Sequence, residues 1–255
     1  DPRSISRRTN PLRPRTALER LPRNPAARNN QHRTLSESTV TLSRKVVFWR
    51  HGRTEWNAQR RFQGQTDIPL DEVGLEQASD AARLLVGVRP TRIISSDLSR
   101  AASTASALAE LVNLDVRTFA GLRETNAGTW EGQTREALIA NHGDELAAWA
   151  AGSNLRPGGG ETRTEVAQRV INVINDELTT ISERETLVVV THGGSARAAI
   201  AMMMELPPEH WAALGVLSNC AWSVLSEKDS QFGPAWRLQE YNAKSLPVPA
   251  LGDDR

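Results

Sequence analysis

Two histidines in this sequence stand where a buried strand is expected to end, and each is followed by glycine. They are His51 and His192, which follow the apolar runs at residues 46–49 and 186–191. An imidazole with one unprotonated nitrogen can attack phosphorus, and a phosphohistidine divides one difficult displacement into two easier steps. The glycines remove side chains that would keep the backbone away from a ligand. The two histidines therefore predict a phosphoryl-transfer site.

Two arginines are expected at the same place. Arg50 precedes His51, and Arg100 falls in the first turn of the helix expected after residues 92–95, where free backbone amides favour anions. A guanidinium group pairs with two phosphoryl oxygens at once and stays charged at any working pH. Its charge also disfavours a neighbouring imidazolium, which keeps one nitrogen of His51 free. Such a pocket would supply the nucleophile and the charge stabilisation that phosphoryl transfer needs.

Three short apolar runs have to position these side chains. Residues 46–49, 92–95 and 186–191 are typical of strands that are buried on both faces, and each is followed by a helical pattern. Strands that alternate with helices predict an α/β fold, a three-layer α/β/α sandwich around a largely parallel sheet. Ligands of such sheets bind beyond the carboxyl ends of the strands. The histidines and arginines are therefore expected to converge at one edge.

The ends of two helices can be predicted from their polar residues. Ser96 or Asp97 is expected to cap the helix after the second strand. Its apolar face is expected to contain Leu98, Ala101, Ala102, Ala105, Leu108 and Leu111. Thr162 and Glu165 have the spacing of a capping box before the third strand. The helix that they begin is expected to bury Val166, Val170, Val173 and Ile174.

Four motifs, in this order, resemble the signatures of the histidine phosphatase superfamily, which has the phosphoglycerate mutase-like fold. They are Arg50-His51-Gly52-Arg53-Thr54 with Asn57, Ser95-Ser96-Asp97-Leu98-Ser99-Arg100-Ala101, Leu122-Arg123-Glu124 before Gly128-Thr129-Trp130-Glu131-Gly132, and Thr191-His192-Gly193. The resemblance extends from about residue 45 to 242. A single Arg-His-Gly would be a weak signal, whereas four motifs in order are specific.

The resemblance implies a role for each matched residue. His51 would be the nucleophile, and Glu124 would protonate the leaving oxygen and then deprotonate the attacking water, with Glu131 as a nearby rival carboxylate. The other implied site residues are Arg50, Arg100 and His192 in the phosphate clamp, and Asn57, Gln63 and Gly193 in contact with the phosphate. Arg53 is left open between support of the site and a solvated position. The family implies no metal and no cofactor.

Two other functions compete with a phosphatase. Mutases of this family carry a long insertion between the acid and the second histidine, which closes over the substrate and excludes water. Here that interval, from Glu124 to His192, is 68 residues long and is already occupied by helical patterns near residues 135–151 and 163–181. Because water can then reach the phosphoenzyme, hydrolysis is favoured. Phosphoglycerate mutase therefore remains the alternative function. A non-catalytic binding protein with the same fold is the third hypothesis.

The substrate is expected to be a small phosphorylated metabolite. Residues 60–65 and 236–243 resemble a group within the family, the actinobacterial glucosyl-3-phosphoglycerate phosphatases. That group's substrate carries a carboxylate beside its phosphate. We therefore expect Arg60 or Arg123 to neutralise a carboxylate.

Composition excludes several classes of protein. The 255 residues contain no apolar run near 18, so no membrane span is expected. The single cysteine, Cys220, excludes a disulfide scaffold and is typical of a reducing, cytoplasmic compartment; we expect it in a buried strand. The tryptophans are expected in the core or the pocket wall, so nucleic acid is not an expected partner. A homodimer is allowed, because members of the family often dimerise.

Charge divides the chain near residue 43. Residues 1–45 contain eleven Lys and Arg against three acids, a balance of +8, which leaves −7 for the remainder. We expect a disordered basic extension at 1–43, a histidine phosphatase domain at 44–245 and a flexible tail at 246–255. The extension is expected to be a solvated tail, with organelle targeting and electrostatic contact with nucleic acid or an acidic surface as alternatives.

Overall fold

The computed structural model describes residues 43–228 and 235–244. The basic extension expected at 1–43, apart from Ser43, and the tail expected at 246–255 lie outside the described residues. None of the helices in this part of the chain has the length and hydropathy that a membrane span requires.

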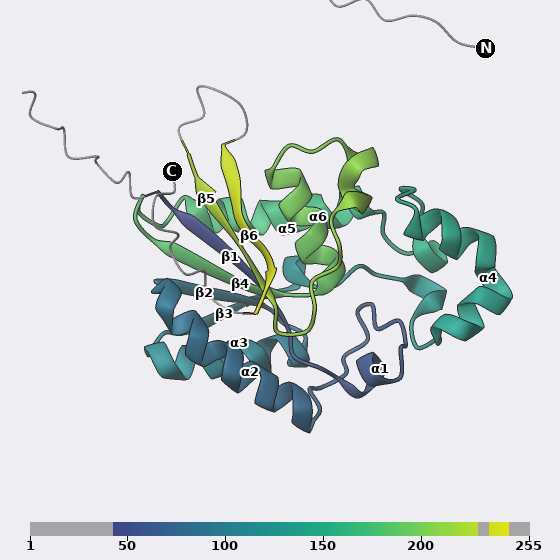
Figure 1. Ribbon diagram of the computed structural model, residues 1–255, viewed down its shortest axis with the longest axis horizontal. Helices are drawn as coiled ribbons and strands as arrows, with labels where there is room; N and C mark the ends of the chain where they lie inside the picture. The colour runs from purple at the N-terminus through teal and green to yellow at the C-terminus, as the bar shows by residue number, and fades with distance from the viewer. Residues whose placement is uncertain (1–42, 229–234, 245–255) are drawn as a thin grey trace, which may run out of the picture. The chain divides into compact units, whose positions relative to one another are not determined.

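A six-stranded sheet forms the centre of the fold, in the order β3-β2-β4-β1-β5-β6 (Figure 1). Its strands are β1 (Lys45–Arg50), β2 (Arg92–Ser96), β3 (Val116–Phe119), β4 (Thr186–Thr191), β5 (Trp222–Glu227) and β6 (Trp236–Ala243). The first four in spatial order run parallel, whereas β5 pairs antiparallel with β1 and β6 pairs antiparallel with β5. The three strands expected from the apolar runs are the central ones, β2, β4 and β1, and the largely parallel sheet is confirmed.

Helices cover both faces of the sheet. The helices are α1 (Glu55–Ala58), α2 (Glu72–Leu85), α3 (Ser99–Val112), α4 (Arg135–Ala150), α5 (Arg163–Leu178) and α6 (Gly193–Met203), with 3-10 turns η1 (Val86–Val88), η2 (Ala120–Leu122), η3 (Gly128–Trp130), η4 (Pro157–Gly159) and η5 (Pro208–Ala213). In Figure 1, α2 and α3 lie on one face, and α5 and α6 lie on the other. The expected α/β/α sandwich is therefore observed.

Alternation along β1 explains why its sequence reads as one continuous apolar run. Val46 and Phe48 pack in the cluster that includes α5 and α6, whereas Val47 and Trp49 pack in the cluster that includes α2 and α3. All four side chains are fully buried. A strand between two helical layers has apolar residues at both alternating positions. Its polar carboxyl end is therefore held firmly by the packed residues before it.

The expected cap of α3 is wrong, although the helix itself is present. It begins at Ser99, and its N-cap residue, Leu98, offers no side-chain hydrogen bond. Instead, Asp67 accepts hydrogen bonds from the amide and the hydroxyl of Ser99, at 2.8 and 2.7 Å. Ser96 accepts only from the amide of Leu98, and Asp97 pairs elsewhere. A residue more than thirty positions earlier thus supplies the cap, which local spacing does not reveal.

Two further expectations fail in detail. Leu111 is 53% exposed, because it lies beside, not within, the buried stripe of α3. Cys220 is buried, as expected, but it lies in the turn before β5 and has a positive φ of 55°. The left-handed conformation of Cys220 is set by that turn.

The capping box of α5 is confirmed. The Thr162 hydroxyl accepts from the amide of Glu165 at 3.2 Å, and the Glu165 carboxylate accepts from the amide of Thr162 at 3.0 Å. The two side chains satisfy two amides that have no partner within the helix. The start of α5 is therefore determined by four consecutive residues.

Replacing the capping hydroxyl should weaken the fold. We expect Thr162→Ala to lower the free energy of unfolding by about 1 kcal/mol, because it leaves the Glu165 amide without its partner. Urea denaturation followed by circular dichroism measures the change. Thr162→Ser keeps the hydroxyl and is the control. Equal stability of the alanine and serine variants would contradict the assignment.

Candidate active site

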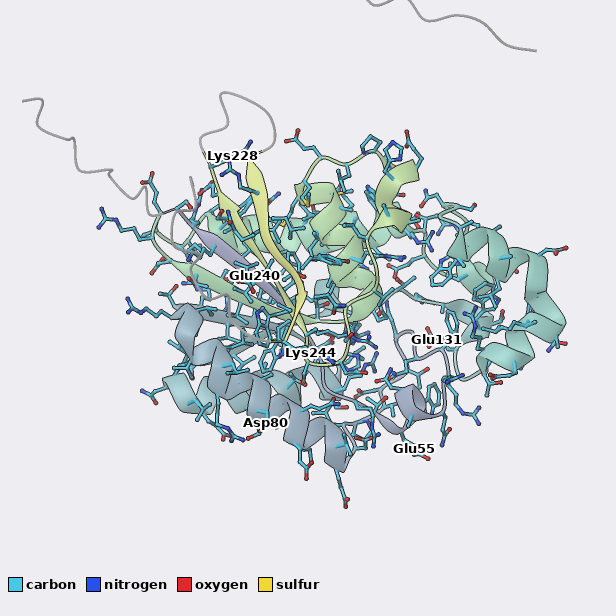
Figure 2. All side chains as sticks on the ribbon, in the orientation of Figure 1. Glu55, Asp80, Glu131, Lys228, Glu240 and Lys244 are labelled. Carbon is cyan, nitrogen blue, oxygen red and sulfur yellow. The ribbon has the colours of Figure 1, made fainter. Side chains whose placement is uncertain are left out.

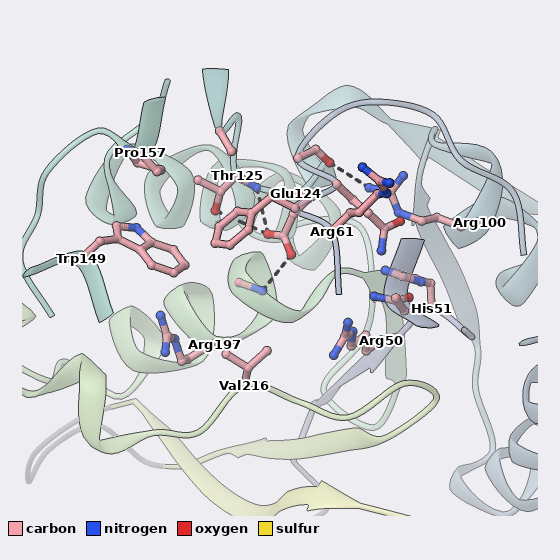
Figure 3. Close-up of a pocket in the computed structure, with 16 residues that line it drawn as sticks. Arg50, His51, Arg61, Arg100, Glu124, Thr125, Trp149, Pro157, Arg197 and Val216 are labelled. Carbon is pink, nitrogen blue, oxygen red and sulfur yellow. Dashed lines mark hydrogen bonds between the residues drawn. The ribbon is translucent and has the colours of Figure 1, made fainter. Parts of the chain in front are cut away.

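The ends of three neighbouring strands meet at one cavity. His51 follows β1, His192 joins β4 to α6, and Arg100 stands in the first turn of α3 after β2. Because β2, β4 and β1 are adjacent and parallel, these ends lie at the same edge of the sheet. The cavity there has a volume of about 260 Å³ (Figure 3). It is lined by Arg50, His51, Asn57, Arg61, Phe62, Gln63, Gly64, Arg100, Glu124, Thr125, Ala127, Trp149, Pro157, Gly194, Arg197 and Val216. His192 is not among these residues; it is fully buried beside the ring of His51.

One hydrogen bond determines which nitrogen of His51 is free. Nδ1 of the buried ring lies 2.6 Å from the carbonyl oxygen of Gly52. A carbonyl can only accept, so Nδ1 carries the hydrogen and the lone pair of the neutral ring is on Nε2. Asn219 donates to the carbonyls of both His51 and Gly52, at 3.1 Å each, and so holds this segment in place. His51 therefore offers Nε2 as a nucleophile.

His192 has the opposite arrangement of donor and acceptor. Arg100 Nε donates to its Nδ1 at 3.3 Å, so the neutral ring carries its hydrogen on Nε2. That Nε2 is buried and has no hydrogen-bond partner among the described residues. The two rings are close, with centroids 5.1 Å apart. A buried donor without a partner beside the His51 ring is suited to a phosphoryl oxygen.

The two arginines bring positive charge to these rings. Arg50 donates to the carbonyl of Leu217 at 2.5 Å, whereas its Nε is buried and unpaired among the described residues. Arg100 donates to the carbonyls of Gly64 and Thr66, at 2.8 Å each. Burial lowers the pKa of Arg100 to about 10, which leaves its guanidinium charged at neutral pH. The clamp therefore stays cationic when it is empty.

Both histidines are held neutral. Burial, and then the charges of Arg50 and Arg100, keep the pKa of His51 well below the ordinary value of 6.5. Burial and the charge of Arg100 do the same to the pKa of His192. A neutral His51 keeps its lone pair at neutral pH, as nucleophilic attack requires.

Glu124 is anchored at the N-terminus of α6. Its Oε2 accepts from the amide of Gly194 at 2.9 Å, and its Oε1 accepts from the amides of Thr125 and Ser195, at 2.8 and 3.0 Å. The Ser195 hydroxyl adds a fourth bond at 3.1 Å. The positive end of the helix dipole attracts a carboxylate at this position. Glu124 is thus aimed into the cavity in one orientation.

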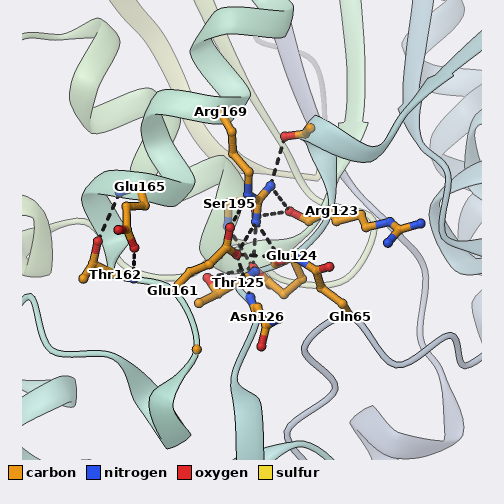
Figure 4. A network of polar contacts seen from close by, with 12 residues as sticks. Gln65, Arg123, Glu124, Thr125, Asn126, Glu161, Thr162, Glu165, Arg169 and Ser195 are labelled. Atoms are coloured by element: carbon orange, nitrogen blue, oxygen red, sulfur yellow. Dashed lines mark hydrogen bonds and ion pairs between the residues drawn. The ribbon is translucent and has the colours of Figure 1, made fainter.

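A half-buried ion pair between Arg169 and Glu161 holds the backbone on either side of Glu124 (Figure 4). Arg169 donates to the carbonyls of Arg123 and Glu124, at 2.6 and 2.8 Å. Glu161 accepts from Arg169 at 2.8 Å and from the amide of Asn126 at 2.8 Å. These bonds join Arg169 of α5, and Glu161 just before that helix, to residues 123–126, the segment between η2 and η3. They position the carboxylate without touching the cavity.

The rival carboxylate, Glu131, has a structural role. It accepts from the amides of Gln65, Thr66 and Ala127, at 3.0, 3.1 and 3.1 Å. The Thr66 hydroxyl donates to it at 2.7 Å. Figure 2 shows Glu131 among the loops on the side of α1, and it is not among the residues that line the cavity. Glu131 binds two loops together, so Glu124 is the carboxylate available for chemistry.

Comparisons with known proteins agree with this geometry. A family model described as histidine phosphatase superfamily (branch 1) matches residues 46–243. The chain belongs to this superfamily. Glucosyl-3-phosphoglycerate phosphatase of Mycobacterium tuberculosis is 37% identical over 214 residues, which cover 80% of this chain and 96% of the relative. A probable phosphoglycerate mutase of Yersinia pestis is 31% identical and covers 82% of this chain and 98% of its own length.

A solved structure shows the same likeness in three dimensions. The mycobacterial glucosyl-3-phosphoglycerate phosphatase in complex with VO3 matches with a TM-score of 0.75 and 38% identity. The match covers 79% of this chain and 100% of that one. The chain is thus a phosphatase of the histidine phosphatase superfamily, with the phosphoglycerate mutase-like fold.

The remaining site residues expected for this histidine phosphatase differ in their positions. Gln63 lines the cavity, and its buried Oε1 has no partner among the described residues. Asn57 also lines the cavity, but its Oδ1 already accepts from Thr54 and Asn219. Gly193 does not line the cavity. A Cβ at Gly193 would lie 2.5 Å from Val216, so packing explains this glycine.

Three further arginines that the sequence analysis named are paired with a carboxylate or lie outside the cavity. Arg53 pairs with Asp71 at 2.8 Å, which supports the start of α2. Arg123 donates two hydrogen bonds to Asp97, at 2.7 and 2.5 Å. Arg60 is exposed and does not line the cavity. The expectation that Arg60 or Arg123 neutralises a carboxylate is therefore not supported, because neither residue lines the cavity.

Two residues of the site were not identified from the sequence. Arg197 lies three positions after Gly194 on α6, and that helical spacing could have indicated a shared face. Asn219 comes from the turn before β5, and no local pattern marks it. Trp149, from α4, was expected in the core or the pocket wall and lines the cavity. Among the described residues, no cluster of three or more His, Cys, Asp or Glu side chains could hold a metal ion.

Matched variants should separate the two carboxylates. We expect Glu124→Gln to lower kcat by about 100-fold or more for an alkyl phosphate such as 3-phosphoglycerate, whose leaving oxygen needs a proton. Glu131→Gln should instead lower the free energy of unfolding by about 1–3 kcal/mol, because it weakens a half-buried acceptor with four donors. Steady-state kinetics and urea denaturation measure the two effects. A loss of kcat in Glu131→Gln and a loss of stability alone in Glu124→Gln would make Glu131 the acid and Glu124 the structural carboxylate.

The neutral histidines should make stability depend on pH. Below about pH 6.5 the unfolded chain binds protons at both rings and the folded chain does not, so the free energy of unfolding falls as pH drops. The fall should reach about 1.4 kcal/mol per pH unit for each histidine. Urea denaturation between pH 7.5 and 5.5 tests this. His192→Gln should reduce the slope of the free energy of unfolding against pH by the contribution of one histidine. His210→Gln, at an exposed position, is the control. A slope in His192→Gln equal to that of the unmodified protein would contradict the prediction.

Proposed function

We propose that this protein is a metal-independent phosphomonoesterase that works through a phosphohistidine at His51. Its substrate is a small phosphorylated metabolite such as glucosyl-3-phosphoglycerate. The observation that carries the proposal is the bond from His51 Nδ1 to the Gly52 carbonyl, at 2.6 Å, which leaves the lone pair on Nε2. Buried donors on Arg50 and His192, which have no partner among the described residues, would form the adjacent phosphate clamp.

The first half of the reaction forms the phosphoenzyme. His51 Nε2 attacks phosphorus, a P–N bond forms and the ester P–O bond breaks. Arg50, Arg100 and the Nε2–H of His192 hold the equatorial oxygens, where charge accumulates in the transition state. Glu124 in its protonated form gives its proton to the leaving oxygen, which departs as the alcohol.

The second half returns the enzyme to its starting state. Water attacks phosphorus, Glu124 accepts a proton from it, and the P–N bond breaks to release orthophosphate and neutral His51. The Nδ1–H bond to Gly52 holds the ring in the same orientation throughout both steps. The proton balance closes on Glu124, because the proton given in the first step is regained in the second.

The choice of substrate is supported by the relatives. The Mycobacterium tuberculosis protein, which is 37% identical, is named a glucosyl-3-phosphoglycerate phosphatase, and a VO3 complex of the mycobacterial enzyme has been solved. A vanadium oxyanion resembles the phosphoryl group that the clamp would hold. A cavity of about 260 Å³ suits a small metabolite and not a macromolecule.

Phosphoglycerate mutase is the second candidate. The observation in its favour is the 31% identical relative from Yersinia pestis, which is named a probable phosphoglycerate mutase. The two activities differ in the acceptor of the phosphoryl group, which is water in a phosphatase and a substrate hydroxyl in a mutase. One reaction mixture can distinguish them.

A phosphorus NMR time course tests the proposal. The protein is given 3-phosphoglycerate and glucosyl-3-phosphoglycerate together in the presence of EDTA. We expect orthophosphate to grow at the expense of the glucosylated ester, and His51→Ala to lower the rate by at least about 1,000-fold. His210→Ala, at an exposed position that does not line the cavity, is the control. A 2-phosphoglycerate signal without orthophosphate would show a mutase, and inhibition by EDTA would refute metal independence.

A further inference from the structure

One cationic side chain that lines the cavity has no hydrogen-bond or ion-pair partner within the part of the chain that the structure describes. Arg197 lines the cavity beside Trp149 and Val216 and is half-buried (Figure 3). Every other arginine of the described residues that is not exposed donates to a protein acceptor. No hydrogen bond or ion pair joins Arg197 to any described residue. A guanidinium in this environment has lost water without gaining an acceptor.

The groups that face Arg197 do not neutralise it. Burial lowers the pKa of Arg197, and Tyr241 and Glu124 only partly oppose this effect. The hydroxyl of Tyr241 donates to the carbonyl of Gly215. The carboxylate of Glu124 is already bound by amides at the start of α6. The charge on Arg197 is therefore open to an anion from outside the protein.

A second cation strengthens the field at this end of the cavity. The guanidinium of Arg163 lies over the Trp149 ring, 4.6 Å from its centroid, and donates to the carbonyl of Ser153. Burial, and then the charge of Arg197, lower the pKa of Arg163 to about 10. Two arginines thus lie close enough to repel each other. Such a pair is stabilised when an anion binds between or beside the two groups.

The cavity consequently has two cationic ends. In Figure 3, Val216 lies between Arg50, in the phosphate clamp, and Arg197. The clamp combines two arginines with a histidine donor and suits a phosphoryl group of about two negative charges. Arg197 offers one guanidinium fork, which matches a single carboxylate in a bidentate pair.

We propose that Arg197 binds a carboxylate of the substrate, which makes the preferred substrates phosphorylated carboxylic acids. The inference rests on the proposed phosphatase function and specifies the class of substrate that this site accepts. The Trp149 ring covers the same end of the cavity, where it would contact the carbon skeleton. Arg197 takes the role that the sequence suggested for Arg60 or Arg123.

Two substrates that differ at one group test this role. 3-Phosphoglycerate and glycerol 3-phosphate carry the same phosphate on three carbons, and a carboxylate in the first replaces a hydroxymethyl group in the second. We expect the unmodified protein to prefer 3-phosphoglycerate in kcat/KM. Arg197→Gln should lower that preference by about 10- to 100-fold, mainly through KM, because one charge-assisted pair is lost. Arg197→Lys should keep part of the preference.

Arg184→Gln is the matched control. Arg184 is exposed and precedes β4, so it lies at the opposite edge of the sheet from the cavity. We expect it to leave both kcat/KM values unchanged. Arg60→Gln, at an exposed arginine outside the cavity, should also leave the preference unchanged. Thermal unfolding of each variant verifies that it is folded.

The possible failures can be told apart. If Arg197→Gln lowers kcat/KM equally for both substrates, or if the unmodified protein shows no preference between them, Arg197 does not bind the substrate carboxylate. If Arg60→Gln abolishes the preference, the carboxylate is read there. p-Nitrophenyl phosphate carries no carboxylate and reports on the phosphatase function alone. Its hydrolysis by the unmodified protein, lost in His51→Ala, would keep the proposed function intact even when the Arg197 proposal fails.

Discussion

The site depends on packing positive charge against two imidazoles that must stay neutral. Arg50, Arg100, His51 and His192 lie together at the end of a buried sheet, and protonation of either ring would add a further cation to a desolvated cluster. Neutrality of the rings removes that repulsion. The two neutral rings also differ in what they offer at Nε2. The hydrogen bond to the Gly52 carbonyl leaves a lone pair on Nε2 of His51, whereas the hydrogen bond from Arg100 leaves an N–H on Nε2 of His192.

The scaffold supplies the remaining conditions. Carbonyl oxygens from Gly64, Thr66 and Leu217 satisfy part of each guanidinium and leave other N–H groups for a ligand. Among the described residues that line the cavity, Glu124 is the carboxylate, and backbone amides at the N-terminus of α6 hold it. A carboxylate paired directly with Arg50 or Arg100 would compete with phosphate. Glu124 influences the charge of both arginines, but no hydrogen bond or ion pair between described residues joins it to either one.

Arginine serves three different purposes within this small region. Arg169 donates hydrogen bonds that join two backbone segments, and Arg123 forms an ion pair with Asp97. Arg100 both donates to backbone carbonyls and lines the cavity. The residue type is the same in each case. What differs is the number of acceptors already within reach, and Arg197 is the arginine in the cavity wall for which the described residues provide none. Availability of acceptors, more than charge, decides which guanidinium is open to a substrate.

The sequence by itself determined the central strands, the capping box at Thr162 and Glu165, and the motifs that place histidines and arginines at the ends of those strands. These features depend on local spacing, because strand burial, helix capping and each family motif are properties of residues that are close in the sequence. It did not determine that Asp67 caps α3, that Glu131 joins two loops, or that Arg197 and not Arg123 is without a partner among the described residues. Each of these is a contact between residues distant in the chain. Only the tertiary structure brings their partners together, and it alone decides which polar group is satisfied and which is left for a ligand.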